Sequence, residues 1–204
     1  MRPSCPRCLR PDEFCVCKDL VAVTARTRVV ILQHPREARL AICSAWLARI
    51  SLVNAELHRG VRFGEGAEVR ALAARPGAAV LFPGEGSTPA EALAGSPPSI
   101  LFAVDGTWQQ AGKMLSVNPW LGALPRVSID AGRPSGYAGL RKEPGEIHLS
   151  TIEAIALTLG ALERDPARFD PMVQAFHRMV ALQLACAKGE RRSPRHRTYG
   201  ADRP

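Results

Sequence analysis

The sequence predicts an α/β protein in which a mainly parallel sheet is covered by helices on both faces. Short apolar runs end abruptly at proline, glycine or aspartate, as buried strands do, and stretches with apolar residues at helical spacing follow them. Strands that alternate with helices pair in parallel, so both faces of the sheet need cover. The length of 204 residues fits one domain with small appendages.

The elements follow one another in the order that this fold requires. The clearest strand covers residues 99–105, where five apolar side chains lie between Ser99 and Asp105. Strands are expected at residues 27–34, 52–57, 78–82, 99–105 and 126–129. Helices are expected at residues 36–50, 108–117, 151–163 and 167–187.

Composition and hydropathy exclude several classes of protein. Hydrophobic residues make up 46% of the chain and charged residues 23%, which excludes a wholly disordered or fibrous protein. No apolar run approaches the roughly 18 residues of a membrane span, and the start of the chain lacks the apolar core of a secretory signal. We therefore expect a cytoplasmic protein with no membrane association.

The formal net charge of +8 is concentrated at the two ends of the chain. Residues 188–204 contain six Lys or Arg against two acidic residues, and residues 1–18 contain four against two. Basic ends on a nearly neutral body indicate a polyanionic partner, with RNA or DNA ahead of a membrane surface. A tail that only improves solubility is the alternative. Residues 188–204 lack a hydrophobic pattern and are expected to be disordered.

Four of the six cysteines are crowded into the first seventeen residues. They are Cys5, Cys8, Cys15 and Cys17. In a chain without an export signal such crowding favours a metal, because zinc prefers four thiolates in a tetrahedron. We expect a zinc-binding segment at residues 1–20, with free thiols and disulfides as alternatives. Cys43 and Cys186 stand alone in apolar helical patterns and are expected to be small core residues.

Three loops lie where an open α/β sheet binds its ligands, beyond the carboxyl ends of the strands. They are residues 83–86, 105–108 and 149–153. Asp105 is the strongest candidate for a functional residue in these loops, because a carboxylate at the end of an apolar strand has no packing role. Two capping boxes, from Thr107 to Gln110 and from Ser150 to Glu153, predict helix starts that can also bind anions. Neither a Rossmann glycine motif nor a P-loop is present in the sequence.

Several segments of this chain together resemble the DTW-domain family. They are the cysteine pairs, Gln33-His34-Pro35, Asp105-Gly106-Thr107-Trp108-Gln109-Gln110-Ala111 and Leu149-Ser150-Thr151-Ile152-Glu153-Ala154. The resemblance covers residues 5 to about 165. It implies a SPOUT-like fold with a C-terminal trefoil knot that holds S-adenosylmethionine. It also implies transfer of a 3-amino-3-carboxypropyl group to N3 of a tRNA uridine.

The resemblance and the chemistry of the substrates imply roles for individual residues. Catalytic roles fall on Asp105, Thr107 and Trp108. Cofactor binding falls on Pro83, Gly84, Gly86, Asp105, Trp108, Leu149, Ser150 and Thr151. Substrate binding falls on Ser135, Tyr137, Arg141 and Lys142, in a loop that has one residue more than the family pattern between Tyr137 and Leu140.

Asp105 has three candidate roles, which the sequence does not separate. Uridine N3 is nucleophilic only as it loses its proton, so a base within hydrogen-bond reach would help. Asp105 could be that base, or it could bind the α-ammonium of S-adenosylmethionine or stabilise its sulfonium.

The sequence leaves two further functions open. One is a SPOUT-type S-adenosylmethionine-dependent RNA methyltransferase, and the other is a non-catalytic zinc-containing RNA-binding protein. The expected organisation is a zinc-binding segment at residues 1–20, a catalytic domain at 21–187 and a basic tail at 188–204. The expected partner is tRNA. The sequence identifies no protein partner and leaves open whether the chain forms a homo-oligomer.

Overall fold

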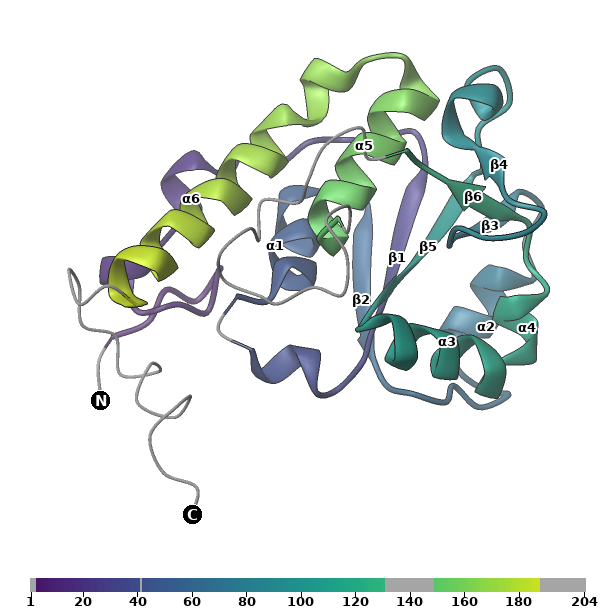
Figure 1. Cartoon of the computed structure of the whole chain (residues 1–204), viewed down its shortest axis with the longest axis horizontal. Coiled ribbons are helices and arrows are strands. Elements are labelled where there is room, and N and C mark those ends of the chain that lie inside the picture. Colours follow the sequence, from purple (N-terminus) through teal and green to yellow (C-terminus); the bar gives the residue numbers. More distant parts are fainter. Residues whose placement is uncertain (1–2, 41, 131–148, 188–204) are drawn as a thin grey trace.

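Six parallel strands form the centre of the computed structural model, which describes residues 3–40, 42–130 and 149–187 (Figure 1). The strands are β1 (Arg28–Gln33), β2 (Ala55–Arg59), β3 (Ala78–Leu81), β4 (Thr88–Pro89), β5 (Ile100–Asp105) and β6 (Arg126–Ser128). Their order across the sheet is β2-β1-β5-β3-β6-β4, and every neighbouring pair is parallel. The prediction of a mainly parallel α/β sheet is therefore confirmed.

Helices cover both faces of this sheet, as the alternation of elements requires. One face carries α1 (Ser44–Ser51), α5 (Thr151–Glu163) and α6 (Asp170–Ala187). The other carries α2 (Glu68–Ala73), α3 (Trp108–Val117) and α4 (Pro119–Gly122). Short 3-10 turns are η1 (Asp12–Phe14), η2 (Cys17–Asp19), η3 (Glu37–Arg39), η4 (Ala90–Leu93) and η5 (Pro166–Phe169).

Alternate side chains of the central strands enter different cores. Val29 and Ile31 of β1 pack with α1, α5 and α6, whereas Val30 and Leu32 pack with α2, α3 and α4. Because successive side chains of a strand point to opposite faces, an uninterrupted apolar strand is what a sheet with two covered faces needs. This explains why the apolar runs of the sequence locate β1, β3 and β5.

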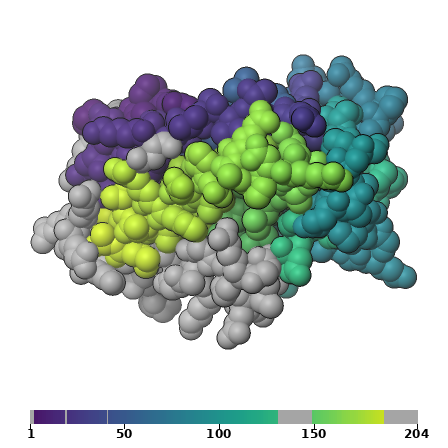
Figure 2. Space-filling model, turned by 90° about the horizontal axis from the view of Figure 1, so that it is seen from above, coloured from purple at the N-terminus to yellow at the C-terminus, as the bar shows by residue number. Residues whose placement is uncertain are grey.

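The N-terminal segment packs directly on the main body. Cys8, Val16 and Leu20 belong to the same core as α1, α5 and α6. Figure 2 shows the segment lying along α6, in purple beside yellow. No helix in the described part of the chain has the length and apolar character needed to span a membrane.

Two predicted elements need correction, and three short helices or strands were not predicted. Residues 36–50 do not form one helix, because extended backbone at Leu40 and Cys43 separates η3 from α1. The second strand is β2 rather than residues 52–57, since Leu52 instead forms a single parallel bridge with Val23. The unpredicted elements are α2, α4 and β4, which are only six, four and two residues long.

Candidate functional site

Asp105 ends β5, and its carboxylate is held by side chains from two neighbouring elements. The residue is buried, with 6% of its surface exposed. The Thr151 hydroxyl donates a hydrogen bond to Oδ1 at 2.6 Å, and Nε2 of Gln33 donates one to Oδ2 at 2.9 Å. Hydrogen bonds to both oxygens stabilise the ionised carboxylate and fix its orientation. The position that the sequence singled out is therefore a buried carboxylate with a fixed orientation.

Gln33 connects this carboxylate to a cation on the edge strand. Its side chain is fully buried, and its Oε1 accepts a hydrogen bond from Nε of Arg59 at 3.2 Å. A guanidinium on one side and a carboxylate on the other allow only one orientation of the amide. Gln33 faces Arg59 in the β1–β2 register and Asp105 in the β1–β5 register. The three residues form a chain across the carboxyl ends of β2, β1 and β5.

Cys43 lies beside this chain and not inside a helix, which corrects the prediction that it is a core residue of a helix. It precedes α1, is half-buried, and its Sγ accepts a hydrogen bond from Nε2 of Gln33 at 3.0 Å. Burial raises the pKa of the Cys43 thiol, and the Asp105 carboxylate adds to this rise. The thiol is therefore protonated at neutral pH. Cys186 is buried on α6, as predicted.

The start of α5 supplies the second contact to Asp105. The predicted capping box is confirmed, because the Glu153 amide donates to the Ser150 hydroxyl and the Glu153 carboxylate accepts from the Ser150 amide. This cap holds Thr151, the first residue of the helix, beside Asp105. Both Ser150 and Glu153 are buried, so the cap belongs to the interior of the site. Leu149 precedes the cap and is half-buried.

The start of α3 lies beside the loop that follows β3. The predicted capping box is confirmed here too, since the Gln110 amide donates to the Thr107 hydroxyl at 3.3 Å. Trp108 is 45% exposed, and its ring meets Phe82 edge-on with ring centroids 5.7 Å apart. Because Phe82 directly follows β3, this contact joins the Asp105–Trp108 segment to the 83–86 loop.

The 83–86 loop requires its glycines. Gly84 has a φ of 140° and Gly86 a φ of 74°, conformations that other residues rarely adopt. A side chain at Gly84 would also approach the Arg126 guanidinium, which lies 5.9 Å from the centroid of the Phe82 ring. Pro83 and both glycines are exposed, so a ligand can approach the main chain here.

The structure thus gathers the three predicted loops at one edge of the sheet. A hydrogen bond joins Thr151 to Asp105, and a ring contact joins Trp108 to Phe82 before the 83–86 loop. Thr107 caps α3, which begins at Trp108. All four residues predicted to bind substrate lie outside the described residues: Ser135, Tyr137, Arg141 and Lys142.

Gln33 and Arg59 have no predicted role, although the structure places both at the site. Gln33 had a signal in the sequence, since it is a polar residue at the end of an apolar strand, as Asp105 is. Arg59 had none, because an arginine at the end of an edge strand is ordinary in a sequence.

The four N-terminal cysteines form a second candidate site. Their sulfur atoms all lie within 4.8 Å of one another, with Cys5 to Cys17 at 3.7 Å and Cys8 to Cys15 at 3.8 Å. A tetrahedral zinc ion with Zn–S bonds of about 2.3 Å separates its sulfurs by about 3.8 Å. The donor set and its spacing therefore fit a tetrahedral metal site.

The turn around Cys5 favours a thiolate. Hydrogen bonds from the backbone amides of Cys8 and Arg7 lower the pKa of the Cys5 thiol to about 6. Burial raises the pKa of Cys15 and of Cys17. A bound divalent cation offsets this rise in pKa, because thiols lose their protons when they bind a metal.

Comparison with known proteins gives a consistent result. The sequence profile of the DTW domain matches residues 2–184. The chain is 31% identical to the protein named tRNA-uridine aminocarboxypropyltransferase 2 from Drosophila melanogaster, over 90% of this chain and 76% of that protein. It is 29% identical to the protein of the same name from Macaca fascicularis, over 96% and 68%. It is 28% identical to tRNA-uridine aminocarboxypropyltransferase A from Arabidopsis thaliana, over 95% and 86%. No solved structure matches the chain at a significant level.

Proposed function

The chain belongs to the DTW-domain family, and from this membership we propose that it is a tRNA-uridine aminocarboxypropyltransferase. It transfers the 3-amino-3-carboxypropyl group of S-adenosylmethionine to N3 of a uridine in tRNA. The observation that carries this proposal is similarity along nearly the whole chain to proteins that bear this name. The geometry supports it, because Gln33, Asp105 and Thr151, from three segments that carry the family resemblance, meet in one hydrogen-bonded cluster.

The reaction is an alkyl transfer that depends on positioning. Uridine N3 forms a bond to the γ-carbon of the arm, the bond from that carbon to sulfur breaks, and sulfur keeps the electron pair. Methylthioadenosine leaves, and N3 loses its proton. The methyl carbon on the same sulfur is less hindered, so the site must hold the γ-carbon in line with N3. Such placement is worth about 7–11 kcal/mol.

The residues at the two sides of Asp105 suggest where each substrate lies. We propose that the 83–86 loop and Trp108 receive the adenosine part of S-adenosylmethionine, because the residues of this loop are exposed and Trp108 is 45% exposed. Leu149, Ser150 and Thr151 would lie beside its amino-acid arm. The roles of Ser135, Tyr137, Arg141 and Lys142 toward the tRNA stay predictions.

Of its three candidate roles, we propose that Asp105 is a fixed anion for the cationic donor. Both of its oxygens already accept hydrogen bonds, from Thr151 and from Gln33. This arrangement favours a carboxylate that stays ionised and attracts an ammonium or sulfonium over one that takes up a proton. Thr151 and Gln33 then act as positioning residues for Asp105.

The four-cysteine cluster would hold a structural zinc ion. Bound zinc would supply folding energy to the N-terminal segment, and the cluster takes no part in the transfer. This segment presents Arg7 and Lys18 at the surface, where they can meet tRNA phosphates.

Other features of the proposal stay predictions. They are the SPOUT-like assignment with its knot, the boundaries at residues 20 and 187, the basic tail and the cytoplasmic location. The predicted loop and tail residues, 131–148 and 188–204, lie outside the described residues.

Incubation of the purified protein with unmodified tRNA and S-adenosylmethionine tests this function. Mass spectrometry of the nucleosides should show uridine that has gained one 3-amino-3-carboxypropyl group, and the small-molecule product should be methylthioadenosine. Uridine that gains one methyl, with S-adenosylhomocysteine as product, would instead identify a methyltransferase. Tight RNA binding with neither product would identify a non-catalytic RNA-binding protein.

Replacing Thr151 by valine should lower kcat about tenfold, because the hydroxyl that holds Oδ1 of Asp105 is lost while the shape of the side chain is kept. Thr151→Ser retains the hydroxyl and should stay within about twofold of the wild type. Initial rates at saturating tRNA, with thermal melting as a check on folding, measure both variants. Equal loss in the two variants would show that the hydroxyl does not position Asp105.

A further inference from the structure

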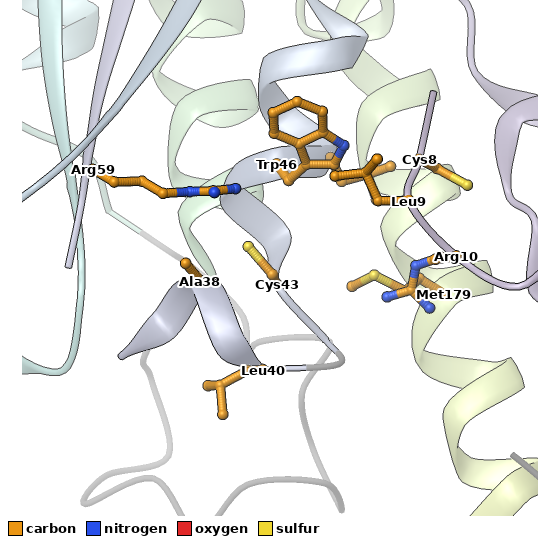
Figure 3. Close-up of a pocket in the computed structure, with 10 residues that line it drawn as sticks. Cys8, Leu9, Arg10, Ala38, Leu40, Cys43, Trp46, Arg59 and Met179 are labelled. Carbon is orange, nitrogen blue, oxygen red and sulfur yellow. The ribbon is translucent and has the colours of Figure 1, made fainter. Parts of the chain in front are cut away.

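We propose that a pocket beside the four-cysteine cluster binds an unstacked nucleotide of the tRNA next to the modified uridine. The inference rests on the proposed function. The pocket opens between the cysteine loop, the segment before α1, the start of α1, the end of β2 and α6 (Figure 3). None of these lining segments contributes to the 83–86 loop or to Trp108, so the pocket is distinct from the proposed adenosine site.

The charge of the pocket fits a phosphodiester. Its described lining residues include two arginines, Arg10 and Arg59, and no acidic residue. Figure 3 shows these two side chains on opposite sides of the pocket. Arg59 uses its Nε for Gln33, and its two terminal amino groups have no hydrogen-bond partner among the described residues. A guanidinium in this state is suited to a phosphate, which accepts two parallel hydrogen bonds.

The remaining wall fits a base. Trp46 and Leu40, both half-buried, line the pocket together with Leu9, which is 46% exposed. The indole is held in place by a hydrogen bond from Nε1 to the carbonyl oxygen of Arg7 at 3.0 Å. Unstacked bases bind to such fixed aromatic and apolar surfaces.

Leu9 is an unusual residue at its position. Its φ of 58° lies in the left-handed region, which disfavours leucine and is better suited to glycine or asparagine. The side chain is also largely exposed, so packing within the protein does not explain it. Contact with a ligand in the pocket does explain an apolar side chain at this turn.

The pocket lies at the right distance from the reaction centre for a neighbouring nucleotide. Arg59, Gln33 and Asp105 are register partners on three adjacent strands. Two strand spacings, about 10 Å, therefore separate the backbone at Arg59 from that at Asp105. S-adenosylmethionine fits the pocket less well, since it carries a net positive charge and would meet two arginines.

Binding of unmodified tRNA to three variants tests the proposal without depending on catalysis. Arg59→Gln should raise the Kd about fivefold or more at moderate salt and lower the slope of log Kd against log salt by about 1. Leu9→Asn should raise the Kd about threefold, and it should keep the fold because asparagine tolerates the left-handed region. Arg75→Gln is the matched control, an exposed arginine just before β3 at the amino ends of the strands, and should stay within about twofold.

The Kd for S-adenosylmethionine should be unchanged in Leu9→Asn and Arg75→Gln, and the zinc content should be unchanged in all three variants. Equal tRNA affinity in Arg59→Gln and Arg75→Gln would overturn the proposal. A weakened affinity for S-adenosylmethionine in Leu9→Asn with unchanged tRNA binding would also overturn it, because it would assign the pocket to the donor. Failure of the wild type to modify tRNA would instead concern the proposed function, which the product assay measures separately.

Discussion

Replacing Asp105 by asparagine should reduce formation of the modified uridine at least about 100-fold and leave tRNA affinity within about twofold of the wild type. Asparagine has the same shape, but the negative charge disappears. Its amide nitrogen must also face one of two donors, either the Thr151 hydroxyl or the Gln33 amide. Leaving this buried donor without an acceptor lowers the free energy of unfolding by about 1–3 kcal/mol. The melting temperature should therefore fall by several degrees.

The kinetic constants separate the candidate roles of Asp105. A fixed anion that attracts the donor predicts a higher KM for S-adenosylmethionine together with a lower kcat. A lower kcat with an unchanged KM for S-adenosylmethionine would favour the role of base and contradict our assignment. Asp165→Asn, a change of the same kind at an exposed position between α5 and α6, should leave both constants unchanged. Wild-type activity in Asp105→Asn would remove Asp105 from the mechanism.

Loss of the metal from the cysteine cluster should be the largest effect on stability. Cys8, Val16 and Leu20 are part of the core that α1, α5 and α6 share, so unfolding of the N-terminal segment exposes that core. Structural zinc contributes on the order of 10 kcal/mol to the folding of such segments, of which we expect several kcal/mol in the stability of this chain. Affinity for tRNA should fall about tenfold, since Leu9 and Arg10 lose their place in the pocket.

Metal analysis and thermal melting, with and without a strong chelator, measure this effect. The wild type should contain about one zinc ion per chain, and Cys8→Ala should lose it. Cys186→Ala is a matched control, because it removes a buried sulfur from α6 and should keep the metal. A metal-free protein of unchanged stability would contradict the assignment. So would disulfides joining Cys5 to Cys17 and Cys8 to Cys15 under reducing conditions.

Local sequence patterns predict much of this fold, because the interactions that produce them are local. A capping box joins residues three positions apart, and both predicted boxes are present at Thr107 and Ser150. Apolar runs predict β1, β3 and β5, since strands buried on both faces have no polar alternation. The same reasoning failed for residues 36–50, where Leu40 and Cys43 have helical spacing but line the pocket and not a helix face.

By itself the sequence determined the class of fold and the cysteine set and made Asp105 a candidate site residue, since each rests on neighbouring residues or on an unexpected residue type. Only the tertiary structure decided which side chains hold Asp105. Gln33 lies 72 residues before it and Thr151 46 residues after it. Arg59 joins them only because β2, β1 and β5 are adjacent and in register. Strand order depends on how all the helices pack, and no short stretch of sequence contains that information.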